Sequence, residues 1–170
     1  YADILIDFPW IDDFAAARNS LMERASGMWF FSVDTDEYLD ENVSELVTFL
    51  RTSGERNEVV ATINVRNYST YEMDGDYSDF YGSRIVRMST GARYEGAIHE
   101  HFNFNRSEVL VCPLNRTILH HDGYVAMRQN SKAGEAKRER NMRLIQRCLE
   151  KSPDNLLLCM QLVEAASSAT

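Results

Sequence analysis

The sequence lacks any apolar run as long as a transmembrane helix, which needs about 20 consecutive apolar residues. It also lacks a signal-peptide pattern at its start. These two absences exclude a transmembrane segment within this chain. The first residue is Tyr1 rather than Met, so we expect the N-terminus of the gene product to lie outside the segment.

Positive charge is scarce. The 170 residues include 18 Lys and Arg against 26 Asp and Glu, which gives a formal net charge of −8. This balance argues against a nucleic-acid backbone or an anionic membrane surface as the main partner. Hydrophobic residues make up 44% of the chain, which is enough for one buried core with an appendage.

Cysteine is also rare, and the three cysteines show neither metal-type nor disulfide-type spacing. An odd number of thiols favours a reducing compartment, and we therefore expect a cytoplasmic protein. The sequence has no Gly-rich phosphate loop, no internal repeat and no low-complexity tract.

The hydrophobic pattern predicts alternating strands and helices followed by shorter strands. This order is typical of an α/β sheet with a mixed edge. A long polar stretch at 67–82 reads as a loop or an irregular hairpin, and 93–101 as a turn that enters a short helix. The expected strands are 2–7, 28–33, 58–66, 84–88, 109–112 and 116–120, and the expected helices run from Asp12 or Asp13 to Gly27 and from 43 to 54.

The amino-acid composition changes near residue 131, where Lys, Arg and Glu become frequent. Two further helices are expected at 132–150 and 155–168, separated by Ser152 and Pro153. The second is apolar on nearly every face, so it is either fully buried or lacks its partner. The sequence therefore favours a chain that is cut at this end too.

An aromatic strand at 28–33, which we expect to be central in the sheet, ends in two carboxylates, Asp34 and Asp36. With this spacing we expect both side chains on one face at the C-terminal end of the strand, where open α/β sheets bind ligands. Hard oxygen ligands there suit Mg²⁺ or Mn²⁺ and, through the cation, a diphosphate. The alternative is that Asp34 starts a turn while Asp36 or Asp40 caps the next helix. Glu37, which follows, reads as a solvated carboxylate.

Three further residues are candidates for phosphate or proton chemistry. Arg18 can reach a phosphate with its planar fork, or it can pair with acidic neighbours on its own helix. Glu100 can act as a general base if a hydroxyl lies within reach, and His99 can orient it or contact phosphate. The alternative for this pair is an exposed helical turn.

Two adjacent imidazoles, His120 and His121, end the last expected strand. A neutral imidazole is a good further ligand for Mn²⁺, although a structural histidine bonded to a loop is the alternative. The spacing from Ile118 favours His120 as the ligand, and the spacing to Gly123 favours His121.

In this order, these motifs resemble the family 2 glycosyltransferases. The resemblance implies the GT-A fold, a Rossmann-like mixed sheet with flanking helices, for residues 1–128. For residues 129–170 it implies a tetratricopeptide-like helical hairpin that is truncated. The segments that carry the resemblance are 10–19, 25–27, 33–37, 84–87, 94–100, 118–124, the helix from Lys132 through Arg140 and Asn141, and 152–154.

The resemblance implies transfer of a sugar, with inversion, from a nucleotide-diphosphate donor to a saccharide, lipid or protein acceptor. Mn²⁺ or Mg²⁺ at Asp34 and Asp36 would neutralise the departing diphosphate, and Arg18 would assist on the phosphate side. Glu100 would take the acceptor proton. Many family members have an acidic pair at the position that reads His99-Glu100 here.

The resemblance also implies that the strands holding the nucleotide base precede Tyr1, so we expect the isolated segment to turn over little or nothing. Two alternatives remain open at this point. One is a non-catalytic, transferase-like module that binds sugar or protein. The other is a metal-dependent nucleotidyl- or phosphotransferase.

Overall fold

The computed structural model describes residues 2–53, 59–69, 75–104, 109–123, 125 and 131–167. The helices and strands follow one another as the hydrophobic pattern predicts over most of the chain. In chain order they are α1 (Phe14–Arg24), β1 (Trp29–Phe31), β2 (Glu37–Leu39), α2 (Ser44–Thr52), β3 (Val59–Tyr68), β4 (Tyr77–Arg87), β5 (Arg93–Glu95), β6 (His101–Asn103), β7 (Leu110–His121), α4 (Ser131–Lys151) and α5 (Leu156–Ser167).

Five strands form one mixed sheet in the order β1-β4-β3-β7-β2. Strands β3 and β7 are parallel, and the other neighbours are antiparallel. The expectation of a mixed α/β architecture is therefore confirmed, whereas the GT-A assignment stays a prediction. Strand β1, expected at the centre, is an edge strand of this sheet because its described partner is β4 alone.

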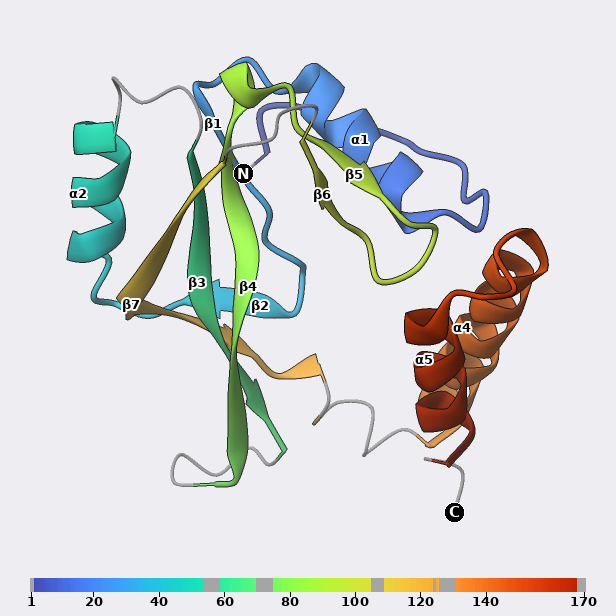
Figure 1. The fold of residues 1–170 in the computed structure, drawn as a ribbon. Helices are drawn as coiled ribbons and strands as arrows, with labels where there is room; N and C mark the ends of the chain where they lie inside the picture. Colours follow the sequence, from blue (N-terminus) through green and yellow to red (C-terminus); the bar gives the residue numbers. More distant parts are fainter. Residues whose placement is uncertain are drawn as a thin grey trace.

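The sheet is covered on both faces, as Figure 1 shows for α2 on one side and α1 with the β5–β6 hairpin on the other. Adjacent residues of the central strands explain this. Val60 and Val86 pack toward α1 and the hairpin, while Ala61 and Ile85 pack toward Leu46 and Phe49 of α2. A strand segment that is buried on both faces has consecutive apolar residues, as β3 has at Val60 and Ala61 and β4 has at Ile85 and Val86.

Helix α1 begins where the sequence predicts. The carboxylate of Asp13 accepts a hydrogen bond from the backbone N–H of Ala16 at 2.8 Å and caps the helix. Asp12, the other candidate cap, has a left-handed backbone (φ 60°) and instead forms ion pairs with Arg143 and Arg147 of α4, at 3.0 and 2.8 Å.

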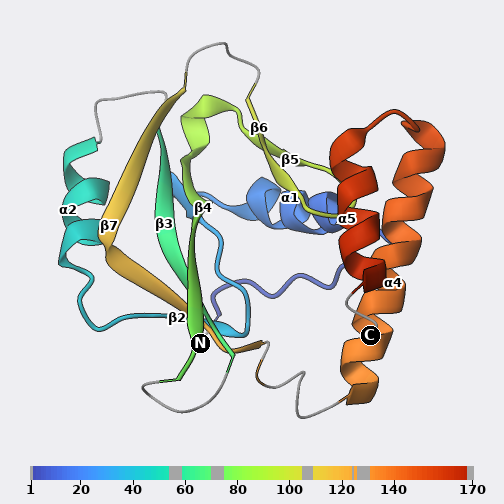
Figure 2. The same cartoon turned by 60° about the horizontal axis from the view of Figure 1, so that its bottom comes forward.

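Helices α4 and α5 form an antiparallel pair at one side of the sheet domain (Figure 2). Leu144 and Ile145 of α4 pack on Ile98 and Phe14, so the pair contacts both α1 and the turn between β5 and β6. One side of α5 is buried against this cluster. The other side exposes the apolar residues Leu156, Leu157, Met160 and Val163.

Several local predictions were wrong. Residues 2–7 form no strand. The segment 93–101 is a hairpin instead of a short helix, because Arg93–Glu95 pairs with His101–Asn103. The two strands expected at 109–112 and 116–120 are one continuous strand, β7. The polar stretch at 67–82, by contrast, takes the second of its two expected forms, the hairpin, because β3 extends to Tyr68 and β4 starts at Tyr77; residues 70–74 lie outside the described residues.

Among the described residues, no helix is both long and apolar enough to span a membrane.

Candidate functional site

Arg18 is the centre of the candidate site. Its guanidinium holds Asp34 with two contacts, Nη1 to Oδ1 at 2.9 Å and Nη2 to Oδ2 at 3.0 Å. The same group donates from Nε to Oε1 of Glu100 at 2.5 Å and from Nη1 to the hydroxyl of Ser32 at 2.6 Å. Arg18 therefore joins α1, the loop between β1 and β2 (residues 32–36, the acidic loop) and the β5–β6 turn. It does not pair with acidic neighbours on its own helix, which was the alternative reading.

Burial and charge act against each other in this cluster. Burial disfavours the charged carboxylate of Asp34, but the hydrogen bonds and charge of Arg18, together with the charges of Arg84 and His121, hold its pKa below the ordinary value. Burial also disfavours the charged form of Arg18, yet Asp34 and Glu100 raise its pKa. Each charge is thus kept ionised by its partners.

Glu100 reaches Arg18 because the β5–β6 hairpin is fastened to α1. The side chain of Asn19 accepts from the backbone N–H of Tyr94 and donates to the Tyr94 carbonyl, both at 2.9 Å. Two left-handed residues, Gly96 (φ 97°) and His99 (φ 53°), then turn the chain so that Glu100 faces inward. His99 itself is exposed.

A buried ion pair shapes the acidic loop. Glu37 was expected to be solvated, but its side chain is only 2% exposed and pairs with Arg84 of β4. Its other oxygen accepts from the backbone N–H of Asp34 at 2.8 Å, and the Glu37 N–H returns a bond to the Asp34 carbonyl at 3.0 Å. Asp34 therefore does start a turn, while remaining held by Arg18. The alternative that Asp36 or Asp40 caps α2 is wrong, because its N-cap is Val43 without a side-chain bond.

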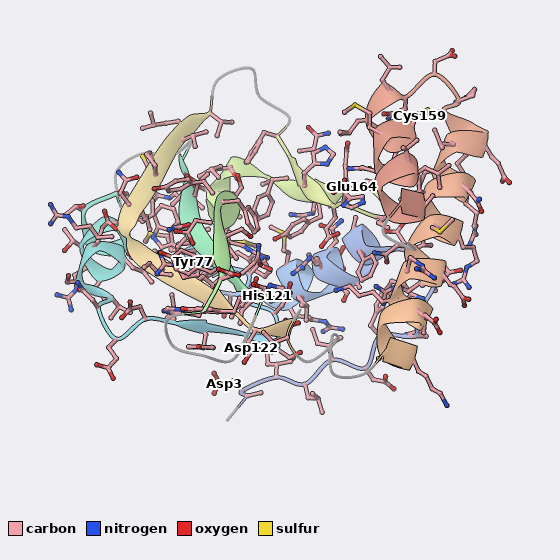
Figure 3. The ribbon with its side chains drawn as sticks, turned by 90° about the horizontal axis from the view of Figure 1, so that it is seen from below. Asp3, Tyr77, His121, Asp122, Cys159 and Glu164 are labelled. Atoms are coloured by element: carbon pink, nitrogen blue, oxygen red, sulfur yellow. The ribbon has the colours of Figure 1, made fainter. Side chains whose placement is uncertain are left out.

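Asp36 points to a different partner from Asp34. Its Oδ2 lies 3.3 Å from Nε2 of His121, which follows from the pairing of β2 with β7. A methyl group on Gly123 would lie 2.1 Å from Oδ2 of Asp36 and 2.8 Å from Nε2 of His121. The two side chains therefore converge on the glycine. Figure 3 shows His121 beside Asp122 at the end of β7, away from Cys159 and Glu164 of α5.

His120 lies on the opposite face of the sheet from His121. Its ring is stacked between Tyr38 and Tyr68, with centroid distances of 5.0 and 5.7 Å. Its Nδ1 bonds to the Tyr68 hydroxyl at 2.7 Å, and its Nε2 lies 3.7 Å from Asp40. Of the two candidate histidines, only His121 shares a face with the acidic loop.

Two side chains at this loop carry donor atoms of the kind that a divalent cation prefers. Asp36 and His121 supply one carboxylate oxygen and one imidazole nitrogen 3.3 Å apart, and Gly123 approaches both so closely that a side chain there would collide with them. No three His, Cys, Asp or Glu side chains gather in the part of the chain that the structure describes. Asp34 meets arginine rather than the Asp36–His121 pair, so the two aspartates have different surroundings.

The sequence did not predict the part that three residues of the candidate site take in its contacts. Glu37, expected to be solvated, has a buried side chain, and its partner Arg84 has no role that the sequence predicts. Oδ1 of Asn67, near the end of β3, accepts a hydrogen bond from Nδ1 of His121 at 2.6 Å. No sequence signal links Asn67 to a histidine 54 positions later.

The chain was compared with known proteins. No family model matches it. It is 27% identical over 162 residues to the SPbeta prophage-derived glycosyltransferase SunS of Bacillus subtilis, and equally to glycosyltransferase SunS of Bacillus phage SPbeta. The aligned part covers 91% of this chain and 35% of either relative.

A second similarity is shorter. Over 96 residues, 56% of this chain, it is 33% identical to a TPR repeat-containing protein of Synechococcus elongatus, of which 22% is covered. The chain thus spans about a third of the length of the SunS proteins and less of the repeat protein. These similarities point to glycosyltransferase-like and helical-repeat features.

Proposed function

We propose that this chain carries the donor-diphosphate and acceptor-activating part of a glycosyltransferase. The observation that carries the proposal is the bridge from Arg18 to both Asp34 and Glu100. The bridge brings together an arginine that can bind phosphate, a carboxylate of the acidic loop and a candidate general base. The similarity to glycosyltransferase SunS supports the same class of activity.

In the proposed reaction the acceptor hydroxyl attacks the anomeric carbon of the sugar. A new carbon–oxygen bond forms as the bond from that carbon to the diphosphate oxygen breaks, with inversion. Glu100 takes the hydroxyl proton, and the electron pair of the broken bond leaves with the diphosphate. Arg18 lies against Oε1 of Glu100 and orients the carboxylate. Its positive charge also favours binding of the anionic donor.

Asp36 and His121 are the residues that would hold Mn²⁺ or Mg²⁺. Asp34, the other expected ligand, would join them only by leaving its contacts with Arg18. Such a cation supplies Lewis-acid neutralisation of the leaving diphosphate. The contribution of the protein is to orient these side chains: the Glu37 bonds shape the loop, and the β2–β7 pairing brings Asp36 to His121. The proposed role of His99, which is exposed beside Glu100, is contact with the phosphate of the donor.

The proposed partners are a nucleotide-sugar donor and a saccharide, lipid or protein acceptor. Since the chain spans about a third of its SunS relatives, contacts to the nucleotide base need not lie within it. A probe without a base is therefore required beside UDP.

The test is calorimetric titration of inorganic pyrophosphate and of UDP into the chain, with and without Mn²⁺. We expect binding that depends on Mn²⁺ and that Asp36→Ala abolishes. Asp40→Ala is the matched control, because Asp40 is an acidic residue of the same segment that faces His120 instead of His121. It should leave binding unchanged.

Absence of Mn²⁺-dependent binding for both probes would overturn metal assistance. If binding occurs, a donor screen follows. Preference for nucleotide-sugars over nucleoside triphosphates supports sugar transfer, and the reverse preference supports a nucleotidyl- or phosphotransferase. Asp34→Ala that keeps the fold and all measurable function would favour a non-catalytic binding module.

A further inference from the structure

Two adjacent histidines of β7 are held in different ways. Nδ1 of His121 contacts Oδ1 of Asn67 at 2.6 Å, and Nδ1 of His120 contacts the hydroxyl of Tyr68 at 2.7 Å. Asn67 and Tyr68 are themselves adjacent on β3, and both histidines pair with β3 in parallel register. The sheet therefore gives each imidazole its own orienting side chain from the neighbouring strand.

The two partners impose different proton positions. An amide oxygen only accepts hydrogen bonds, so Nδ1 of His121 must carry the proton in the contact with Asn67. A hydroxyl can donate or accept, so Tyr68 leaves both tautomers of His120 available. Asn67 thus selects one form of its histidine, and Tyr68 does not.

With the proton on Nδ1, the Nε2 atom of a neutral His121 presents its lone pair. That atom lies 3.3 Å from Oδ2 of Asp36, and a Cβ atom added at Gly123 would lie 2.8 Å from Nε2 of His121 and 2.1 Å from Oδ2 of Asp36. Two electron-pair donors at this distance repel unless a positive charge lies between them. A second proton on the imidazole or a divalent cation supplies that charge, and the cation takes both atoms as ligands.

We propose that Asn67 is a positioning residue that prepares His121 as the nitrogen ligand of the cation. The inference rests on the proposed metal-assisted function. Asn67 touches neither donor nor acceptor in this scheme; it acts through His121 by fixing the ring orientation and the tautomer. Groups bonded to the second nitrogen of a metal-binding histidine raise metal affinity in this way.

The test compares Asn67→Leu with Tyr68→Phe in the whole chain. Each variant removes the Nδ1 partner of one histidine, and the two sites are adjacent on the same strand. Two quantities are measured. The first is the pair of imidazole ¹⁵N chemical shifts of His121 without metal, in mildly alkaline buffer where imidazole is neutral. The second is the dissociation constant for Mn²⁺.

We expect Asn67→Leu to weaken Mn²⁺ binding about 10- to 100-fold and to move the His121 proton from Nδ1 alone to both nitrogens. Tyr68→Phe should change neither quantity for His121. Asn67→Asp restores an acceptor oxygen, so it should return the proton to Nδ1. This rescue separates positioning from a general loss of structure.

The inference is overturned if Asn67→Leu leaves both the tautomer and the Mn²⁺ affinity unchanged while His121→Ala abolishes binding. In that case the proposed cation site stands without Asn67. If the unmodified chain binds no Mn²⁺, the metal-assisted function fails and the inference fails with it. A His121 proton on Nε2 in the unmodified chain would also overturn it.

Discussion

Replacing Arg18 with methionine tests the central cluster most directly. Methionine keeps an unbranched side chain of similar reach but removes the charge and every donor. The variant removes the cation of Glu100, whose side chain is 14% exposed, and leaves Asp34, whose side chain is 40% exposed, with the longer contact to Arg84 at 3.8 Å. Breaking a buried ion pair by removing one partner costs about 3–5 kcal/mol. Because Asp34 is partly solvated, we expect the lower end, about 3 kcal/mol of unfolding free energy.

A double-mutant cycle then assigns this loss. With Arg18→Met present, Glu100→Gln removes the uncompensated carboxylate and should restore roughly 1–2 kcal/mol. In the unmodified chain the same Glu100→Gln change should destabilise. Urea denaturation followed by circular dichroism measures all four free energies. A loss below about 1 kcal/mol for Arg18→Met, with additive effects in the double variant, would refute the reasoning.

The pH dependence has a defined sign. The folded pKa of Asp34 lies below its ordinary value of 3.8, although burial opposes the shift. The ionised Asp34 carboxylate therefore adds to the free energy of unfolding above the unfolded pKa. This stabilisation is lost as pH falls through the lower folded pKa. In Arg18→Met the burial of Asp34 remains, and its nearest cation is gone while Arg84 stays at 3.8 Å. The stability difference between the two proteins should be largest near neutral pH and shrink below about pH 4.

Two other predictions concern the strand and the loop. Phe30 and Phe31 are both half-buried and pack against clusters on opposite faces. Each change to Ala should cost roughly 1.5–3 kcal/mol in urea denaturation, below the value for a fully buried Phe; a negligible loss at either position would contradict this packing. Gly123→Ala would place a methyl group 2.1 Å from Oδ2 of Asp36 and 2.8 Å from Nε2 of His121. It should therefore weaken Mn²⁺ binding at least about tenfold. An unchanged dissociation constant would contradict the convergence of the pair on Gly123.

Local sequence rules predicted much of the framework. The Asp13 cap, the spacing of apolar residues in α1 and α2, and the two C-terminal helices follow from interactions within a few residues, so they are visible in the sequence. The rules did not predict the β5–β6 hairpin. It is stabilised by Asn19 of α1 through bonds to Tyr94, 75 positions away.

In the candidate site, too, the sequence predicted the residue types but not the contacts between distant segments. The sequence alone identified Arg18, Asp34, Asp36, Glu100 and the two histidines as chemically suited groups, because their residue types and local spacing carry that information. It left open the choice between His120 and His121 and misread Glu37 as solvated. The tertiary structure separated the histidines onto opposite faces and buried Glu37 against Arg84.

What the sequence determined by itself is therefore the succession of helices and strands and the inventory of reactive side chains. Only the tertiary structure decided which of them meet. The physical reason is that strand register sets partners between distant segments: pairing Glu37 with His121 and Asn67 with His121 fixes one face for the acidic loop and the opposite face for His120. A shift of one residue in either pairing would exchange the two histidines.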